Sequence, residues 1–127
     1  MRAGNAGFLR GRGKSFADAG RGIAWILKTQ CNAKLHLMAT VLVVAAGWLF
    51  QVSSLEWVIL VLAMSLVWSA EAFNSALERL ADAVTEEPHP FVGQAKDAAA
   101  GAVLLASTGA AIVGVLLFLP YVLDFFR

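Results

Sequence analysis

The chain has 127 residues, of which 59% are hydrophobic and only 15% are charged, and its formal net charge is +1. This composition is too apolar for an ordinary soluble domain of this length. Three segments account for the excess, and the only acidic residue within them is Glu56; they cover residues 35–50, 55–70 and 98–123.

The N-terminal region divides into two parts. Residues 1–14 are rich in Gly and Arg, and we predict a flexible basic segment. From about residue 15 to 31 we predict an amphipathic helix that lies on the membrane surface. Its apolar side chains fall near one side: Phe16, Ile23, Ile26 and Leu27. A disordered basic tail is the alternative for this region.

The apolar segments are long enough to cross a membrane once their flanks are included. A helix needs about 20 residues to cross a hydrocarbon core of roughly 30 Å. Because the segments are apolar all round, they lack the amphipathic pattern of a soluble helix bundle. The sequence therefore predicts an all-α membrane protein, with residues 15–127 as one domain. The expected transmembrane helices are residues 33–51, 55–84 and 95–123.

Basic residues predict the orientation in the membrane. The link "QVSSLE" between the first two spans has no Lys or Arg, whereas the link between the second and third spans carries Arg79 and Lys96. The positive-inside rule therefore places the N-terminus inside and the C-terminus outside. The basic residues before the first span are Arg2, Arg10, Arg12, Lys14, Arg21, Lys28 and Lys34.

A polar stripe continues the second span in "WSAEAFNSALERLADAV", residues 68–84. It consists of Glu71, Asn74, Glu78 and Asp82, spaced by three, four and four residues. Glu71 and Glu78 differ by only about 20° around the helix axis. A carboxylate within a membrane span is costly and by default indicates function. The alternative is a helix end facing water, where Glu78 and Asp82 are merely solvated.

The next link, "TEEPHPFVGQAKD", adds a second group of polar residues. Pro88 and Pro90 predict the end of the helix and a short turn, and Lys96 and Asp97 begin the third span. A lysine here can bind a phosphate, and an opposing carboxylate can bind Mg²⁺ together with phosphate oxygens. A simple interfacial Lys96–Asp97 ion pair is the alternative. The titratable residues of the turn itself are Glu86, Glu87 and His89.

These two stretches together carry a resemblance to a known family. "EAFNSALERLAD" followed by "EPHPFVGQAKDAAAGAVLLAS" resembles the signature of the small prokaryotic diacylglycerol kinases, which include undecaprenol kinases. The resemblance extends from residue 15 to about residue 120. Within it, "NAKLH" and "AKDAAAGAVLLAS" are more similar to the undecaprenol kinase branch.

The resemblance implies an ATP-dependent lipid kinase of the bacterial cytoplasmic (inner) membrane. It implies a homotrimer with active sites shared between protomers, Mg²⁺ as cofactor, and no nucleic-acid partner. Glu71 would be the general base and, with Asn74 and Ala100, would contact the lipid, while Glu78 would bind the metal. The residues expected to contact ATP are Glu78, Glu87, Pro88, His89, Lys96 and Asp97.

Two positions depart from the family pattern. Gln30 stands where many members have a metal-binding Glu, so it is a candidate ligand of metal and ATP that supplies no negative charge. Asp18 stands where an aromatic residue often contacts ATP. It is a candidate ATP contact whose carboxylate could supply the negative charge that Gln30 lacks.

Three questions stay open at the level of sequence. The lipid is undecaprenol or diacylglycerol, because both offer a primary hydroxyl at the same depth. A degenerate, non-catalytic membrane protein of the same fold is one alternative function. A small ion-path component that uses Glu71 as an ion site is the other.

Overall fold

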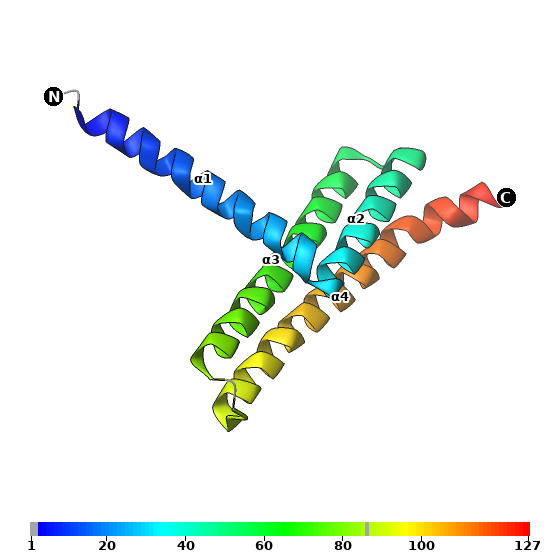
Figure 1. Ribbon diagram of the computed structural model, residues 1–127. Helices are drawn as coiled ribbons and strands as arrows, with labels where there is room; N and C mark the ends of the chain where they lie inside the picture. The colour runs from blue at the N-terminus through cyan, green and yellow to red at the C-terminus, as the bar shows by residue number, and fades with distance from the viewer. Residues whose placement is uncertain (1–2, 86) are drawn as a thin grey trace.

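The fold is a long helix attached to a bundle of three others (Figure 1). The structure, a computed structural model, describes residues 3–85 and 87–127, with side chains from Arg12 onward, so Glu86 lies outside the described residues. Within these ranges the helices are α1 (Ala3–Thr29), α2 (Cys31–Leu49), α3 (Ser54–Val84) and α4 (Pro90–Phe125), with no strand among them. The predicted all-α architecture is confirmed.

Helix α1 is longer than the sequence predicted. We expected a surface helix from about residue 15, but α1 begins at Ala3 and ends at Thr29. The glycines on which the expectation rested weaken a helix, but this segment has no proline to stop one. The predicted flexibility of residues 1–14 concerns motion and stays a prediction.

The remaining three helices are each long and apolar enough to cross a membrane, as predicted. At 1.5 Å per residue, the 19 residues of α2 extend about 28 Å, whereas α3 with 31 and α4 with 36 extend about 46 and 54 Å. Since a hydrocarbon core is roughly 30 Å thick, α3 and α4 are longer than the membrane requires. Their surplus forms a helical hairpin that projects beyond the start of α2 (Figure 1).

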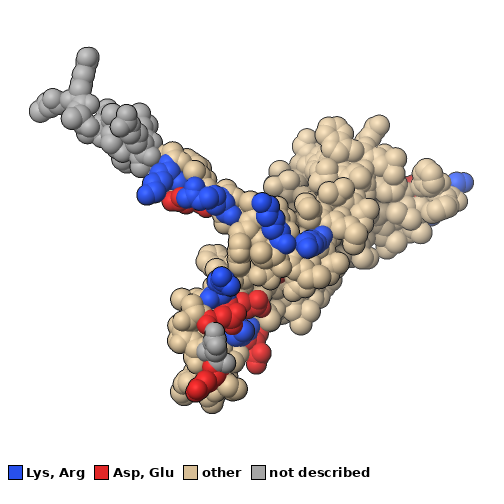
Figure 2. All heavy atoms as spheres, in the orientation of Figure 1, with Lys and Arg blue, Asp and Glu red and all other residues tan. Residues whose placement is uncertain are grey.

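Charged side chains gather on two parts of the molecule. Figure 2 shows Lys and Arg along α1, and acidic and basic residues together at the turn between α3 and α4. On this face the broad body formed by α2, α3 and α4 shows few charged side chains, which lie near the start of α2 and at the C-terminal end (Figure 2). Its exposed side chains include Leu42, Leu66 and Leu105, which suit contact with lipid or another apolar surface.

The C-terminal end of α1 docks where α2 and α3 lie close together. Ile26 and Leu27 of α1, Leu37 of α2, and Trp68 and Ala72 of α3 border one apolar pocket. If α1 lies on the membrane surface as predicted, this contact marks the level of that surface on α3. Beyond Ala72, α3 continues for about 18 Å into the hairpin.

The opposite end of the bundle is held by a capped turn. Ser53 and Glu56 form a capping box at the start of α3, which satisfies backbone N–H groups of the first turn. Tyr121 of α4 donates a hydrogen bond of 2.8 Å to Glu56. Pro120 lies inside α4, which bends near its C-terminal end in Figure 1. Glu56, the only acidic residue of the apolar segment 55–70, therefore has a structural partner.

Candidate active site

The register between α3 and α4 determines which polar residues meet. Helix α4 starts with Pro90 in its first turn, a favoured position because proline has no N–H to leave unpaired. At this end Lys96 of α4 lies 3.0 Å from Asp82 of α3, and at the far end Tyr121 bonds Glu56. The two helices therefore run antiparallel in one fixed register along their whole shared length.

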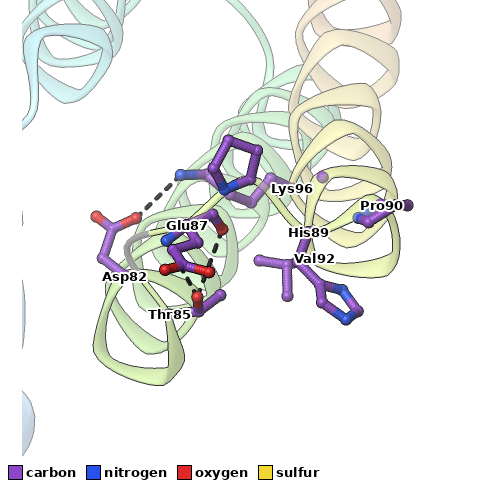
Figure 3. A pocket seen from close by; sticks show the side chains of 9 residues that line it. Asp82, Thr85, Glu87, His89, Pro90, Val92 and Lys96 are labelled. Carbon is purple, nitrogen blue, oxygen red and sulfur yellow. Dashed lines mark hydrogen bonds and ion pairs between the residues drawn. The ribbon is translucent and has the colours of Figure 1, made fainter.

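A pocket of about 770 Å³ opens beside the turn, and we call it the turn pocket (Figure 3). In Figure 3 the Lys96 side chain reaches across from α4 to the Asp82 carboxylate. The hydroxyl of Thr85 accepts a hydrogen bond of 3.1 Å from the backbone N–H of Glu87, which shapes the turn. The lining residues are Asp82, Thr85, Glu87, Pro88, His89, Pro90, Val92, Gly93 and Lys96.

Deeper in the bundle lies a polar cluster, formed by His36 of α2, Glu71, Asn74 and Glu78 of α3, and Ser107 of α4. Glu71 is only 1% exposed and Asn74 only 4%. The Asn74 amide donates a hydrogen bond of 3.1 Å to Glu78, and His36 Nε2 lies 3.7 Å from Glu71 Oε2. Glu71 therefore lies beside His36 of α2, and Glu78 lines the same pocket as Ser107 of α4.

Several atoms of the polar cluster lack hydrogen-bond partners among the described residues. Buried polar groups in proteins are nearly always paired, because an unpaired one loses its hydration without compensation. A set of unpaired atoms in one place therefore indicates that something else binds there. The atoms are His36 Nε2, Glu71 Oε2, Asn74 Oδ1 and Ser107 Oγ.

A second pocket, the cluster pocket, joins the polar cluster to the hairpin. It has a volume of about 290 Å³ and is lined by Asn32, Leu35, His36, Asn74, Glu78, Ala100, Val103, Leu104 and Ser107. Glu78 in this pocket is one helical turn from Asp82 in the turn pocket, and Ala100 is one turn from Lys96. The two pockets therefore follow one another along the groove between α3 and α4.

The structure brings most of the predicted site residues together in these pockets. Asn74, Glu78 and Ala100 line the cluster pocket, beside the buried Glu71. The turn pocket takes Glu87, Pro88, His89 and Lys96.

Four predicted residues are not among the described residues that line either pocket. One of them, Glu71, is buried beside His36, which does line the cluster pocket. Asp18 forms an ion pair with Arg21 on α1. Gln30 is the N-cap of α2, at its junction with α1. Asp97 is exposed at the surface of α4.

The structure places three residues in the site that had no predicted role there. The only signal for Ser107 was its polarity within an apolar run, whereas His36 ends the stretch "NAKLH" that carried part of the resemblance. Asp82 was interpreted as solvated or part of the stripe, but its partner is Lys96 from the next helix. Lys96 therefore pairs across the helices and not with its neighbour Asp97.

These features define a helical membrane protein with a polar groove that runs from a buried carboxylate to a lysine at the turn between α3 and α4. The family model of prokaryotic diacylglycerol kinase matches residues 17–118, and the chain belongs to that family. The predicted family is thereby confirmed, and with it the class of lipid kinase, for which ATP is the implied co-substrate.

Relatives of known name agree with this assignment. An undecaprenol kinase of Bacillus subtilis (strain 168) is 41% identical over 107 residues, which cover 84% of this chain and 87% of that protein. A diacylglycerol kinase of Synechocystis sp. is 39% identical over 111 residues, 87% of this chain but 63% of that protein. The diacylglycerol kinase of Escherichia coli (strain K12) is 41% identical over 64 residues, 50% of this chain and 52% of that protein.

Proposed function

We propose that the protein transfers the γ-phosphoryl group of ATP to the primary hydroxyl of undecaprenol at the cytoplasmic face of the bacterial inner membrane. The observation that carries this proposal is the buried carboxylate of Glu71, at the level where α1 docks on the bundle. The similarity to an undecaprenol kinase across most of both chains supports undecaprenol over diacylglycerol.

Glu71 is the general base of the proposed reaction. Its Oε2 atom has no hydrogen-bond partner in the described part of the chain, so the carboxylate is not already committed to an interaction that would prevent it from accepting a proton. A lipid whose chain stays in the membrane presents its hydroxyl near the membrane surface, which is the depth of Glu71. The lipid headgroup therefore meets the base without leaving the bilayer.

The chemical step is an in-line displacement at the γ-phosphorus. The hydroxyl proton passes to Glu71 while the lipid oxygen forms a bond to the γ-phosphorus. The bond between that phosphorus and the oxygen bridging to the β-phosphate breaks, and ADP leaves with the bonding electrons. Catalysis of phosphoryl transfer is mostly positioning and charge neutralisation, so a base and a few charged groups suffice.

The nucleotide occupies the turn pocket in this proposal. Lys96 donates to phosphate oxygens, and its present partner Asp82 keeps the ammonium directed across the groove. Glu87, Pro88 and His89 form the wall that contacts the rest of the nucleotide. The path from Lys96 to Glu71 then follows the α3–α4 groove, from phosphate to lipid hydroxyl.

Mg²⁺ fits the donor atoms in the cluster pocket. Glu78 supplies a carboxylate and Asn74 an unpaired amide oxygen, both hard ligands of the kind that Mg²⁺ prefers. Groups of three or more His, Cys, Asp or Glu that could hold a metal do not occur among the described residues. A nucleotide-bound Mg²⁺ usually takes only one or two protein carboxylates, and it would neutralise phosphate charge here.

A homotrimer with shared sites is part of the proposal. Gln30 and Asp18, which the resemblance assigns to metal and nucleotide, lie on α1 or its junction with α2 and line neither pocket described above. A neighbouring protomer that brings its own α1–α2 junction to the groove would complete the site. The apolar exposed surface of the bundle is compatible with such packing.

The test is transfer of radiolabelled phosphate from ATP into extracted lipid by the purified full-length protein. Undecaprenol and diacylglycerol are supplied in parallel, and the Glu71→Gln variant is the control. We expect label in undecaprenol. Faster labelling of diacylglycerol would show that diacylglycerol, not undecaprenol, is the preferred substrate. Labelling of neither lipid would refute the proposed kinase activity and favour a non-catalytic or ion-path protein.

A further inference from the structure

Helices α2 and α3 are joined by two polar contacts one helical turn apart. His36 of α2 faces Glu71 of α3, with 3.7 Å between Nε2 and Oε2. One turn further along α2, Thr40 accepts a hydrogen bond of 3.0 Å from the indole N–H of Trp68. Trp68 lies one turn before Glu71 on α3, so the two contacts follow one another along the interface between these antiparallel helices.

The His36 ring is held in place by the same tryptophan. The edge of one ring faces the other, with 6.3 Å between centroids and 68° between planes. Because the Trp68–Thr40 hydrogen bond fixes the indole, it also limits the positions open to the imidazole. Packing against Trp68 therefore helps to hold the His36 ring with its Nε2 atom toward Glu71.

The His36–Glu71 contact is buried, but the two side chains do not form a hydrogen bond. The side chain of His36 is 18% exposed and that of Glu71 is 1% exposed. A separation of 3.7 Å is too long for a hydrogen bond, and neither Nε2 nor Oε2 has another partner among the described residues. Catalytic hydrogen bonds are often long without substrate and shorten in the complex.

A purely structural histidine would leave a different pattern. In a packed bundle its polar atoms would be paired, since unpaired buried donors are costly. His36 instead lines the cluster pocket with Asn74, Glu78 and Ser107, where its free nitrogen faces the base. This location indicates that His36 interacts with Glu71 and does not only pack in the bundle.

We propose that His36 is a positioning residue for Glu71. Its Nε2–H donates to Oε2 of Glu71 when substrate is bound, which orients the carboxylate so that its other oxygen meets the lipid hydroxyl. The proton of the lipid passes to Glu71, and His36 keeps its own. This inference rests on the proposed role of Glu71 as the base.

The experiment measures kcat and both KM values for the full-length protein in mixed micelles with undecaprenol and MgATP. His36→Leu and His36→Met remove the donor with two different shapes, so that a folding failure of one leaves the other. His36→Gln retains an N–H group near the position of Nε2 and is the rescue variant. Glu71→Gln is measured beside them as the test of the base itself.

We expect the Leu and Met variants to lose about ten-fold in kcat, as for one hydrogen bond to a charged group, with both KM values within about two-fold of wild type. The Gln variant should recover most of this loss. Wild-type kcat in the Leu and Met variants would overturn the inference. So would a rise in the lipid KM at constant kcat, or a Gln variant as slow as Leu.

These outcomes separate the inference from the proposed function. A slow Glu71→Gln variant beside fully active His36 variants would refute the positioning role and leave the base intact. A fully active Glu71→Gln variant would refute the base, and the role of His36 with it.

Discussion

Lys96 of α4 and Asp82 of α3 form an ion pair across the turn pocket, with 3.0 Å between the ammonium nitrogen and a carboxylate oxygen. Their side chains are 40% and 62% exposed, so the pair adds little to stability. Its consequence is orientation, because the carboxylate holds a flexible lysine over the groove where a phosphate would bind.

Replacing Lys96 by Ala should raise the KM for ATP about ten-fold or more, because a charge-assisted hydrogen bond to phosphate is lost. Steady-state kinetics at saturating lipid measure this change. Arg127→Ala is the matched control, since it removes a similar ion pair with Asp124 far from the site. An unchanged KM for ATP in the Lys96 variant would mean that the turn pocket does not bind the nucleotide.

Glu71→Gln should lower kcat by about 10²–10⁴, since the amide has nearly the same shape but does not accept a proton as a carboxylate does. The KM for ATP should change little, because the nucleotide binds further along the groove. Glu56→Gln on the same helix is the matched control. Glu56 caps α3 at the far end and should leave turnover unchanged. Normal turnover of the Glu71 variant would exclude it from the mechanism.

A Mg²⁺ titration of lipid phosphorylation tests the two metal candidates. Glu78→Gln should nearly abolish activity, because its carboxylate is the charged ligand in the cluster pocket. Gln30→Glu restores the charge that many relatives have and should lower the Mg²⁺ concentration for half-maximal activity. An unchanged midpoint in the second variant would mean that position 30 is not a ligand. A harmless Glu78 variant would mean that the metal site is elsewhere.

The predicted topology places the C-terminus outside the cell. In a Cys31→Ser background, which removes the chain's only cysteine, Arg127→Cys should react with a membrane-impermeant maleimide in intact spheroplasts. Labelling only after the membrane is permeabilised would show that the C-terminus lies inside the cell. The turn pocket would then lie outside, on the side of the membrane without ATP. Retention of lipid kinase activity verifies that both substitutions leave the fold intact.

The mass of the protein in mild detergent should correspond to three chains. Co-expression of Glu71→Gln, which lacks the base of its own groove, with an Asp18→Ala, Gln30→Ala double variant, which lacks the residues expected from the neighbouring protomer, tests the shared site. If each site combines residues from two protomers, mixed oligomers recover part of the activity. A fully active monomer would contradict both the trimer and the shared site.

The sequence by itself determined the elements and the family. Apolar runs with no helical face predicted the spans, and α2, α3 and α4 begin and end within about five residues of the expected positions. The stripe of Glu71, Asn74 and Glu78 followed from helical periodicity, which is a local property of the chain. Family resemblance rested on the order of residues, which needs no coordinates.

Only the tertiary structure decided which residues meet across helices. Contacts such as His36 with Glu71 and Lys96 with Asp82 depend on the register between antiparallel helices. A spacing pattern within one helix does not encode that register, because it is set by side-chain packing between helices. The alternative of a Lys96–Asp97 ion pair could be weighed only in the structure, where Lys96 pairs with Asp82 of the neighbouring helix. His36 and Ser107 became site residues only once α2 and α4 packed against α3 and their polar atoms were buried beside Glu71 and Asn74.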